Sequence, residues 1–302
     1  MLRTTHTSTV TEDQIDHLGH MNVMYYGVNA MAGTRAVVAE LPGWVDGLLV
    51  FDTYTRHHHE QLLGSPLAVR SAVLDAGPTA VRIHHELRNV DTDELAATFV
   101  HGAYPVDGGV RRPVPDGAIT AAGAEAAPLP DYAAPRSVTL DADLLASSPS
   151  LETLQARNLA FRHPRTIGPS ECDAEGRYRV EMAPALTWAG EQVEGEEPDH
   201  LHETADGKLM GWASMETRAV FGALPSVGSR IQSFAAGVAI HDKVIHRLNW
   251  AYDLDRGTLL TAFESISLAF DVRSRRPMSI PAGYRAKTEA SVHPDLAPQT
   301  TV

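Results

Sequence analysis

The chain has 302 residues, of which 43% are apolar and 21% are charged, and its formal net charge is −13. This length exceeds one ordinary core and predicts two domains, while the composition is typical of a globular protein. The acidic balance argues against a general nucleic-acid-binding function, because phosphates need a basic face. No apolar run approaches the ~20 residues that span a bilayer, so no membrane segment is expected.

The cysteine content and the N-terminal stretch both bear on location. The single cysteine, Cys172, excludes an intramolecular disulfide, and MLRTTHTSTVTEDQ lacks the apolar segment of a secretory signal. Both features predict a cytoplasmic protein. Because the sequence around Cys172 offers no basic partner, we interpret this residue as a buried structural thiol.

The first part of the chain predicts a strand, a helix and four further strands. Residues 3–11 predict the strand, and residues 22–41 predict a helix that ends at Pro42 and Gly43. Strand-like runs follow near 48–60, 67–75, 79–89 and 95–106. Residues 116–157, which contain AAGAEAAPLP and ASSPS, predict a linker.

The second part predicts the same order of elements. A strand is expected before ECDAEGR (171–177), and PALTWAGEQVEG predicts a helix from Pro184. Strands are expected near 210–222, 230–240, 243–253 and 258–271, and residues 286–302 predict a frayed tail. One helix with a mostly antiparallel sheet, occurring twice, predicts the α+β class with domains at 1–115 and 158–285.

An internal repeat supports this division. Shifted by 164 residues, Gly64–Pro113 aligns without a gap on Gly228–Pro277. The identical pairs are Gly64/Gly228, Ser65/Ser229, Ala72/Ala236, Asp91/Asp255, Leu95/Leu259, Phe99/Phe263, Asp107/Asp271, Arg111/Arg275, Arg112/Arg276 and Pro113/Pro277. The turns NVDTDEL and DLDRGTL also coincide between strand-like runs, so the chain predicts a duplicated unit.

The stretch DHLGHMN (16–22), followed by Tyr25 and Tyr26 and later by HHHEQLLGSPLAV, resembles the DxxGHxN signature of hotdog-fold acyl-CoA thioesterases. These are similar to the 4-hydroxybenzoyl-CoA thioesterase superfamily. Glu60 before Gly64 resembles the arrangement in betainyl-CoA and carnityl-CoA thioesterases. The resemblance implies two tandem hotdog domains, each a long helix wrapped by a curved antiparallel sheet, that pair as an internal pseudo-dimer.

The resemblance also implies a chemistry: hydrolysis of a small or medium acyl-CoA, with CoA as part of the substrate and no other cofactor. Asp16 would serve as general base or nucleophile. Amides at a helix N-terminus just after Gly19 would stabilise the oxyanion. His20 and Asn22 would orient the water or the thioester. Glu60 would either project toward the substrate or lie at a solvated strand end.

Simpler interpretations stand beside these roles. Asp16 could instead cap the following turn, a common use of Asp. His57, His58 and His59 do not predict a metal site, because in a strand the middle side chain faces away from the other two. HLHE (200–203) lacks the spacing of a zinc-hydrolase helix. We therefore expect no metal.

Two sets of residues are candidates for substrate contacts. Tyr25 and Tyr26 are candidates for an acyl pocket, although packing in the core is the alternative. Arginine pairs follow the last strand of each unit, and they are either CoA-phosphate ligands or ordinary surface residues. These arginines are Arg111, Arg112, Arg275 and Arg276.

The second unit departs from the motif. It keeps Asp173 and Gly176 but has Arg177 in place of the motif histidine and lacks the motif asparagine. The first site is therefore expected to carry the turnover. A hotdog enoyl-CoA hydratase or dehydratase and a non-catalytic acyl-CoA-binding protein are the alternative functions, and a homodimer of the whole chain is a further expectation.

Overall fold

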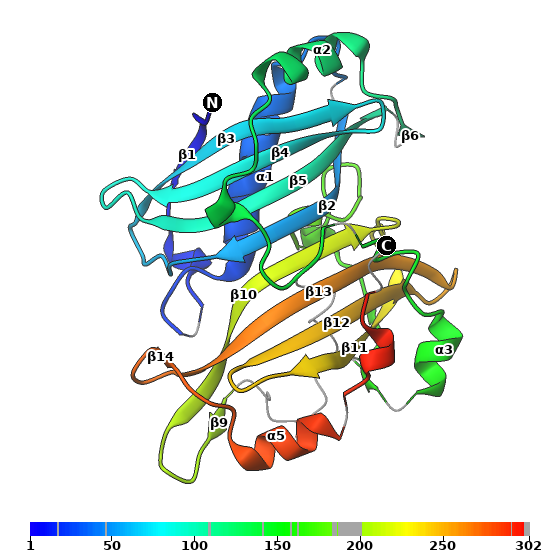
Figure 1. Ribbon diagram of the computed structural model, residues 1–302. Coiled ribbons are helices and arrows are strands. Elements are labelled where there is room, and N and C mark those ends of the chain that lie inside the picture. The colour runs from blue at the N-terminus through cyan, green and yellow to red at the C-terminus, as the bar shows by residue number, and fades with distance from the viewer. Residues whose placement is uncertain are drawn as a thin grey trace. The chain divides into compact units, whose positions relative to one another are not determined.

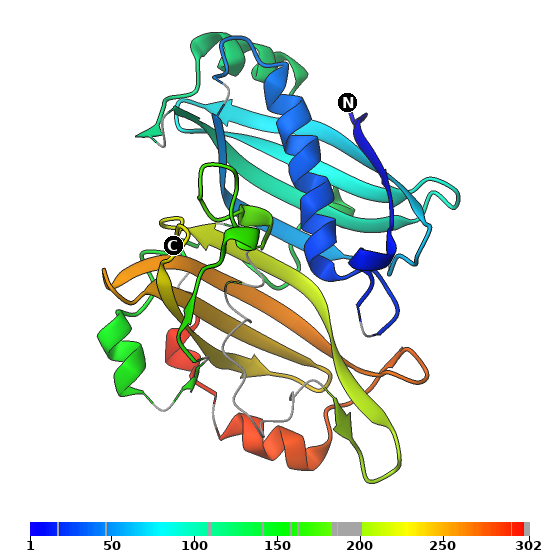
Figure 2. The same ribbon diagram turned by 180° about the vertical axis from the view of Figure 1, so that it is seen from behind.

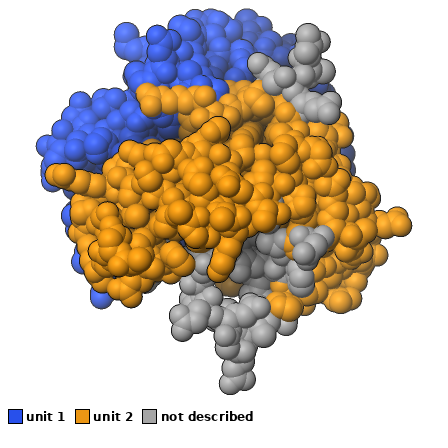
Figure 3. All heavy atoms as spheres, turned by 60° about the horizontal axis from the view of Figure 1, so that its bottom comes forward, with its two compact units in different colours: residues 1–135, 180–183 blue, residues 136–179, 184–302 orange. Residues whose placement is uncertain are grey.

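The computed structural model describes residues 1–16, 18–45, 47–107, 110–140, 142–157, 159–161, 163–182, 186, 201–290 and 292–298. The chain divides into two compact units. Unit 1 comprises residues 1–135 and 180–183, and unit 2 comprises residues 136–179 and 184–302 (Figure 3). Each unit contributes its own run of antiparallel strands and has its own buried clusters.

Unit 1 is built on an antiparallel sheet with the strand order β1-β3-β4-β5-β2 (Figure 1). Its strands are β1 (Arg3–Thr9), β2 (Gly47–His57), β3 (Pro66–Gly77), β4 (Ala80–Asn89) and β5 (Leu95–Asp107), and the short β6 (Val110–Arg111) pairs with β5. These strands confirm the five expected from the sequence in this part of the chain.

The helix α1 (Val23–Ala39) lies along one face of this sheet (Figure 2). It confirms the helix expected over 22–41. The buried residues of α1 recur at helical spacing and include Tyr26, Ala30, Thr34 and Val37. The helix approaches the sheet closely at Gly33, where a Cβ atom would lie 2.7 Å from Val69 Cγ1.

The predicted linker differs in the structure, because its first part belongs to unit 1. Residues 116–125 form the helix α2 (Asp116–Glu125). Ala118 and Ala122 are buried beside Val114 and Val73 in the core. The alanine-rich composition is typical of a linker, yet alanines four residues apart make an apolar stripe on a helix. The division between the units follows Pro135.

The strands of unit 2 are antiparallel and hydrogen-bonded in the order β10-β13-β12-β11-β7. The long strands are β10 (Leu209–Phe221), β11 (Arg230–Ile240), β12 (Val244–Asp253) and β13 (Thr258–Asp271), and they confirm the four expected strands. The short strands are β7 (Ala160–Phe161), β8 (Arg165–Thr166), β9 (His202–Glu203) and β14 (Arg276–Pro277). Apart from Leu186, the helix expected from Pro184 lies outside the described residues.

The second part of the predicted linker and the predicted tail also pack on unit 2. The helix α3 (Leu151–Ala156) brings Leu154 into a buried cluster with Trp250 and Tyr252. The helix α5 (Ala282–Glu289) contacts β11, and His293 N donates to Gly237 O at 2.8 Å. The 3₁₀ turns of the chain include η1 (Glu12–Gln14), η2 (Asp131–Ala133), η3 (Pro169–Glu171), η4 (Val180–Met182) and η5 (Pro294–Leu296). No described helix is both long and apolar enough to cross a bilayer.

The same local turn occurs once in each unit. In unit 1, Asp16 N donates to His20 O at 2.9 Å, and in unit 2, Asp173 N donates to Arg177 O at 2.8 Å. Gly19 has φ of 84° and Gly176 has φ of 77°. The backbone of the motif therefore recurs even where its side chains change.

Candidate active site

The motif loop of unit 1 closes on itself between η1 and α1. Gly19 N donates to the Asp16 carbonyl at 3.0 Å, and Asp16 Oδ1 accepts from Leu18 N at 2.8 Å. Gly19 has a left-handed backbone that side-chain-bearing residues rarely adopt. One carboxylate oxygen of Asp16 thus holds its own turn, and the other is available for a different contact.

His20 lies between two carboxylates. Its Nδ1 is 3.4 Å from Asp16 Oδ2, and its Nε2 is 3.5 Å from Glu60 Oε1. The side chains of His20 and Asp16 are 12% and 15% exposed, whereas that of Glu60 is 50% exposed. The structure therefore brings together three of the predicted site residues as an acid–histidine–acid group with one side open to solvent.

Tyr26 holds the segment that carries Glu60. The Tyr26 hydroxyl accepts from Gln61 N at 3.0 Å and donates to His59 O at 3.3 Å, so it binds the backbone on both sides of Glu60. Burial raises the pKa of Tyr26 well above its usual range. Tyr26 is buried, and Tyr25 donates to Asp13 O at 3.3 Å on the exposed side. These contacts give Tyr26 a positioning role.

The expected oxyanion site needs a correction. The helix does not begin just after Gly19, because α1 starts at Val23. Asn22 is its N-cap, and Asn22 Oδ1 accepts from Met24 N at 3.0 Å. The Gly19 amide is already bonded to Asp16 O. Asn22 thus has a structural use that explains its place in the motif, since an Asn there satisfies an N-terminal amide.

Two predicted arginines lie far from this loop. Gly47 pairs with Val106 at one end of the β2–β5 ladder, and His57 pairs with Ala97 at the other. At ~3.3 Å per residue this separates the ends by roughly 30 Å. Because Arg111 and Arg112 follow the Val106 end and Glu60 follows the His57 end, the structure does not bring them together.

The contacts of the four arginines are local. Arg111 donates to Thr79 O at 2.6 Å and lies over the Tyr104 ring at 4.1 Å. Arg112 pairs with Asp107 at 3.0 Å. In unit 2, Arg275 is exposed in the turn before β14, and Arg276 is the exposed first residue of β14.

The histidines at 57–59 take different positions. Burial and the neighbouring His58 lower the pKa of His57 to about 4, and the His57 ring packs edge-on against Tyr26. His59 is exposed, with Nδ1 3.8 Å from Glu94 Oε1. Among the described residues, no group of three or more His, Cys, Asp or Glu side chains is placed to hold a metal ion.

Sequence reasoning missed a buried polar cluster between α1 and the sheet. Thr34 Oγ1 lies 2.8 Å from both His85 Nε2 and His101 Nδ1, and His85 Nδ1 lies 2.7 Å from Ser71 Oγ. The two histidines and their hydroxyl partners are buried, with His85 at 0% and His101 at 3% exposure. Histidines among the apolar residues of strands predicted near 79–89 and 95–106 were the available signal.

The loop of unit 2 has a different electrostatic environment. Arg177 Nε donates to Asp173 Oδ2 at 3.0 Å, and Arg177 N donates to Asp173 Oδ1 at 2.8 Å. Burial alone would raise the pKa of Asp173, but the Arg177 backbone and side chain hold it below its usual value. Leu224 stands where the 164-residue shift places Glu60. At the described positions that correspond to His20 and Glu60, unit 2 therefore has Arg177 and Leu224, and the Arg177 side chain also pairs with Glu175 at 3.1 Å.

The comparisons with known proteins agree with this asymmetry. Residues 10–135 match the Thioesterase-like superfamily. This range contains the motif loop, and it ends with the last residue of the first segment of unit 1. The match to this family model therefore lies within unit 1. A search of curated proteins finds no match.

Solved thioesterases share the fold of this chain. A Lactobacillus plantarum protein provisionally assigned as an oleoyl thioesterase has a TM-score of 0.61 at 8% identity, over 89% of this chain and 97% of its own. The 12:0-ACP thioesterase from Umbellularia californica has a TM-score of 0.58 at 12% identity, over 89% of this chain and 94% of its own. An acyl-ACP thioesterase from Bacteroides thetaiotaomicron has a TM-score of 0.58 at 10% identity, over 88% of this chain and 97% of its own. At these identities the likeness shows the fold alone, an α+β arrangement with a long helix on an antiparallel sheet.

Proposed function

We propose that this protein hydrolyses an acyl thioester, with an acyl-CoA as substrate, and that the reaction takes place at the motif loop of unit 1. The observation that carries the proposal is His20 between Asp16 and Glu60, in the range that matches the Thioesterase-like superfamily. Two carboxylates and an imidazole supply the proton acceptors and donors that hydrolysis requires.

In the proposed reaction, Asp16 removes the proton of a water molecule that attacks the thioester carbonyl, or attacks that carbonyl itself. The C–S bond then breaks, and the departing thiolate takes up a proton. The first route gives the free acid directly, and the second gives an anhydride with Asp16 that water hydrolyses to the acid. His20 orients Asp16 and Glu60 through its two ring nitrogens. The half-exposed Glu60 is placed to exchange protons with solvent. Backbone amides of the motif region would stabilise the oxyanion.

The two roles of Asp16 differ in where the oxygen of water ends. A single turnover in ¹⁸O-labelled water leaves label in the Asp16 carboxylate only when that carboxylate forms an acyl-enzyme anhydride. Mass spectrometry of the peptide that contains Asp16 measures this directly. If Asp16 acts as a base, all of the label appears in the released acid.

We also propose that the two units are tandem hotdog domains that pair within the chain. Two observations support this. The turn around Asp16 recurs around Asp173, and the similar thioesterases extend over 88–89% of this chain. A homodimer of the whole chain and a cytoplasmic location stay predictions from the sequence, which light scattering and cell fractionation would test.

A panel of acyl-CoAs of increasing chain length, with a thiol reagent present, tests the function. Release of free CoA is the expected result. An altered acyl-CoA without free thiol would indicate a hydratase or dehydratase instead, and saturable binding without conversion would indicate a binding protein. The same acyl groups carried on acyl-carrier protein separate the two thioester carriers, because acyl-ACP thioesterases are among the proteins of similar fold.

A further inference from the structure

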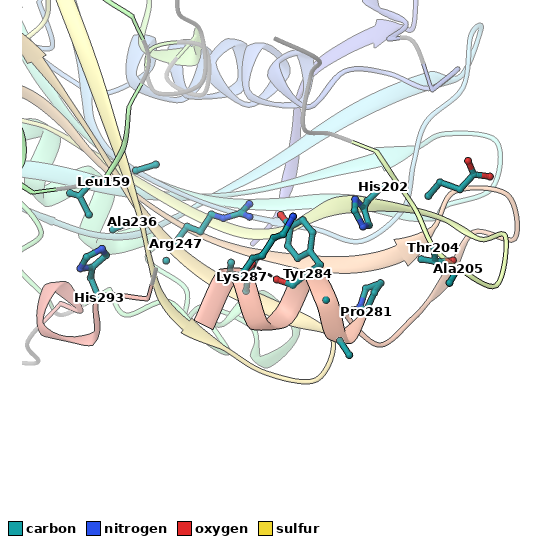
Figure 4. Close-up of a pocket in the computed structure, with 17 residues that line it drawn as sticks. Leu159, His202, Thr204, Ala205, Ala236, Arg247, Pro281, Tyr284, Lys287 and His293 are labelled. Atoms are coloured by element: carbon teal, nitrogen blue, oxygen red, sulfur yellow. Dashed lines mark hydrogen bonds between the residues drawn. The ribbon is translucent and has the colours of Figure 1, made fainter. Parts of the chain in front are cut away.

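Unit 2 contains a pocket of about 890 Å³ that has no role in the proposed hydrolysis. It lies between β11 and β12 of the sheet, the strand β9 and the helix α5, all within unit 2 (Figure 4). Pockets of about 300–1,000 Å³ are typical of sites for small organic molecules. Its volume therefore suits a ligand much larger than an inorganic ion.

Cationic side chains from several elements line this pocket. Arg247 comes from β12, Lys287 from α5, His202 from β9, and His293 from the segment after α5. Figure 4 shows Arg247 and Lys287 near the middle of the lining, with His202 toward one end and His293 with Leu159 toward the other. Glu203 is the carboxylate residue among the described lining residues.

Arg247 and Lys287 differ from other cations of unit 2. Arg165 pairs with Glu171 at 2.8 Å and Arg230 pairs with Asp255 at 3.2 Å. Within the part of the chain that the structure describes, neither Arg247 nor Lys287 has a carboxylate at ion-pair distance. The Arg247 guanidinium is partly buried and lies over the Trp212 ring at 5.2 Å. Two uncompensated cations in one pocket on a chain of net charge −13 favour an anionic ligand.

Part of the lining is apolar. Ile245 on β12 is buried, and Ala235 and Gly237 lie across from it on the same face of β11. The Tyr284 ring contributes an aromatic wall, with its centroid 5.5 Å from that of His202. The pocket thus combines a cationic part with an apolar part, which is the complement of a molecule with an anionic head and an apolar body.

We propose that this pocket binds an organic anion whose carboxylate or phosphate lies between Arg247 and Lys287 and whose apolar part packs on Ala235, Gly237 and Ile245. Arginine donates two parallel hydrogen bonds to either oxyanion, which makes it the main determinant of affinity. The site does not depend on hydrolysis in unit 1, so it stands whether or not the proposed function is correct.

Calorimetric titration of the full chain with hexanoate, hexyl phosphate and hexanol tests the proposal. We expect saturable binding of at least one anion, weakened by salt, and no comparable binding of hexanol. The preferred anion then identifies the head group. Arg247→Gln should weaken binding by at least about 10-fold, in line with loss of a charge-assisted bidentate contact. The matched control Arg230→Gln, outside the pocket, should leave the affinity unchanged.

Two further variants guard against a folding defect in Arg247→Gln. Lys287 lies on the exposed side of α5. Lys287→Gln should therefore weaken anion binding and leave the melting temperature of the protein unchanged. Ala235→Phe keeps every charge but fills the apolar part, and it should reduce binding of hexyl phosphate. The proposal is overturned if neither anion binds saturably, if hexanol binds as well as the anions, or if folded Lys287→Gln binds with unchanged affinity.

Discussion

The two motif loops have the same backbone and opposite electrostatics. Each closes with a hydrogen bond from the aspartate amide to the carbonyl four residues later, and each has a glycine with positive φ. In unit 1 the aspartate faces the imidazole of His20, whereas in unit 2 it faces the guanidinium of Arg177. The same loop geometry can therefore hold different side-chain chemistry in the two units.

The largest expected difference between the units is their stability in acid. Burial lowers the pKa of His101 to about 3, and burial with the neighbouring His101 and His84 lowers that of His85 well below its usual value. The folded state therefore keeps both histidines neutral, while the unfolded chain takes up protons below pH ~6.5. Unit 1 should be fully stabilised above that pH and lose up to about 1.4 kcal/mol per pH unit for each histidine below it.

Tryptophan fluorescence during an acid titration measures this. Trp44 is the tryptophan of unit 1, so the signal that the wild type has and Trp44→Phe lacks reports the unfolding of unit 1. Asn249 and Ser265 occupy the shifted positions of His85 and His101 and do not titrate. The double variant His85→Asn/His101→Ser should be less stable at pH 7 but should lose less stability between pH 6.5 and 4.5. Equal acid sensitivity of wild type and variant would contradict the explanation.

The next difference concerns turnover. Asp16→Asn removes the negative charge and keeps the size of the side chain, so we expect kcat to fall by at least about 100-fold, the usual effect of losing a general base. Asp173→Asn should leave kcat nearly unchanged, because Arg177 already occupies that carboxylate. Steady-state kinetics with the best substrate of the acyl-CoA panel measure both. Damage from Asp173→Asn with an active Asp16→Asn would place the site in unit 2.

Glu60 should have a smaller effect. Its carboxylate lies beside His20 at the half-exposed edge of the group. We expect Glu60→Gln to lower kcat by about 10-fold and to change the pH profile, because proton transfer loses one partner. Glu94→Gln is a matched control, since Glu94 also lies beside a histidine but on the exposed side of His59. Equal effects of the two substitutions would assign Glu60 to the solvated strand end.

The smallest expected effect is shared by both units. A Cβ at Gly19 would meet no atom within 4 Å, and one at Gly176 would meet only Val227 at 3.9 Å. Alanine at either position therefore adds backbone strain without a clash, at a cost of about 1–2 kcal/mol. Thermal melting should detect similar losses for Gly19→Ala and Gly176→Ala, whereas kinetics should detect a loss of activity only for Gly19→Ala.

The strands and α1 could be predicted from the sequence, because alternating and helical burial patterns are local properties of the chain. The repeat placed β11, β12 and β13 in register with β3, β4 and β5 for the same reason. The burial of residues in the predicted linker could not be predicted from a local pattern. Whether Ala118 and Leu154 are exposed or buried depends on apolar surfaces that other parts of the chain supply.

By itself, the sequence determined which residues are available for chemistry: Asp16, His20 and Glu60 in unit 1, and Asp173 with Arg177 in unit 2. Tertiary structure alone decided their contacts. Glu60 reaches His20 because Tyr26 holds the backbone at 59–61, and Asn22 caps α1 because the helix starts at Val23. It also put Arg247 and Lys287 into one pocket. Such contacts join residues far apart in the chain, and their distances follow from packing rather than from any local pattern.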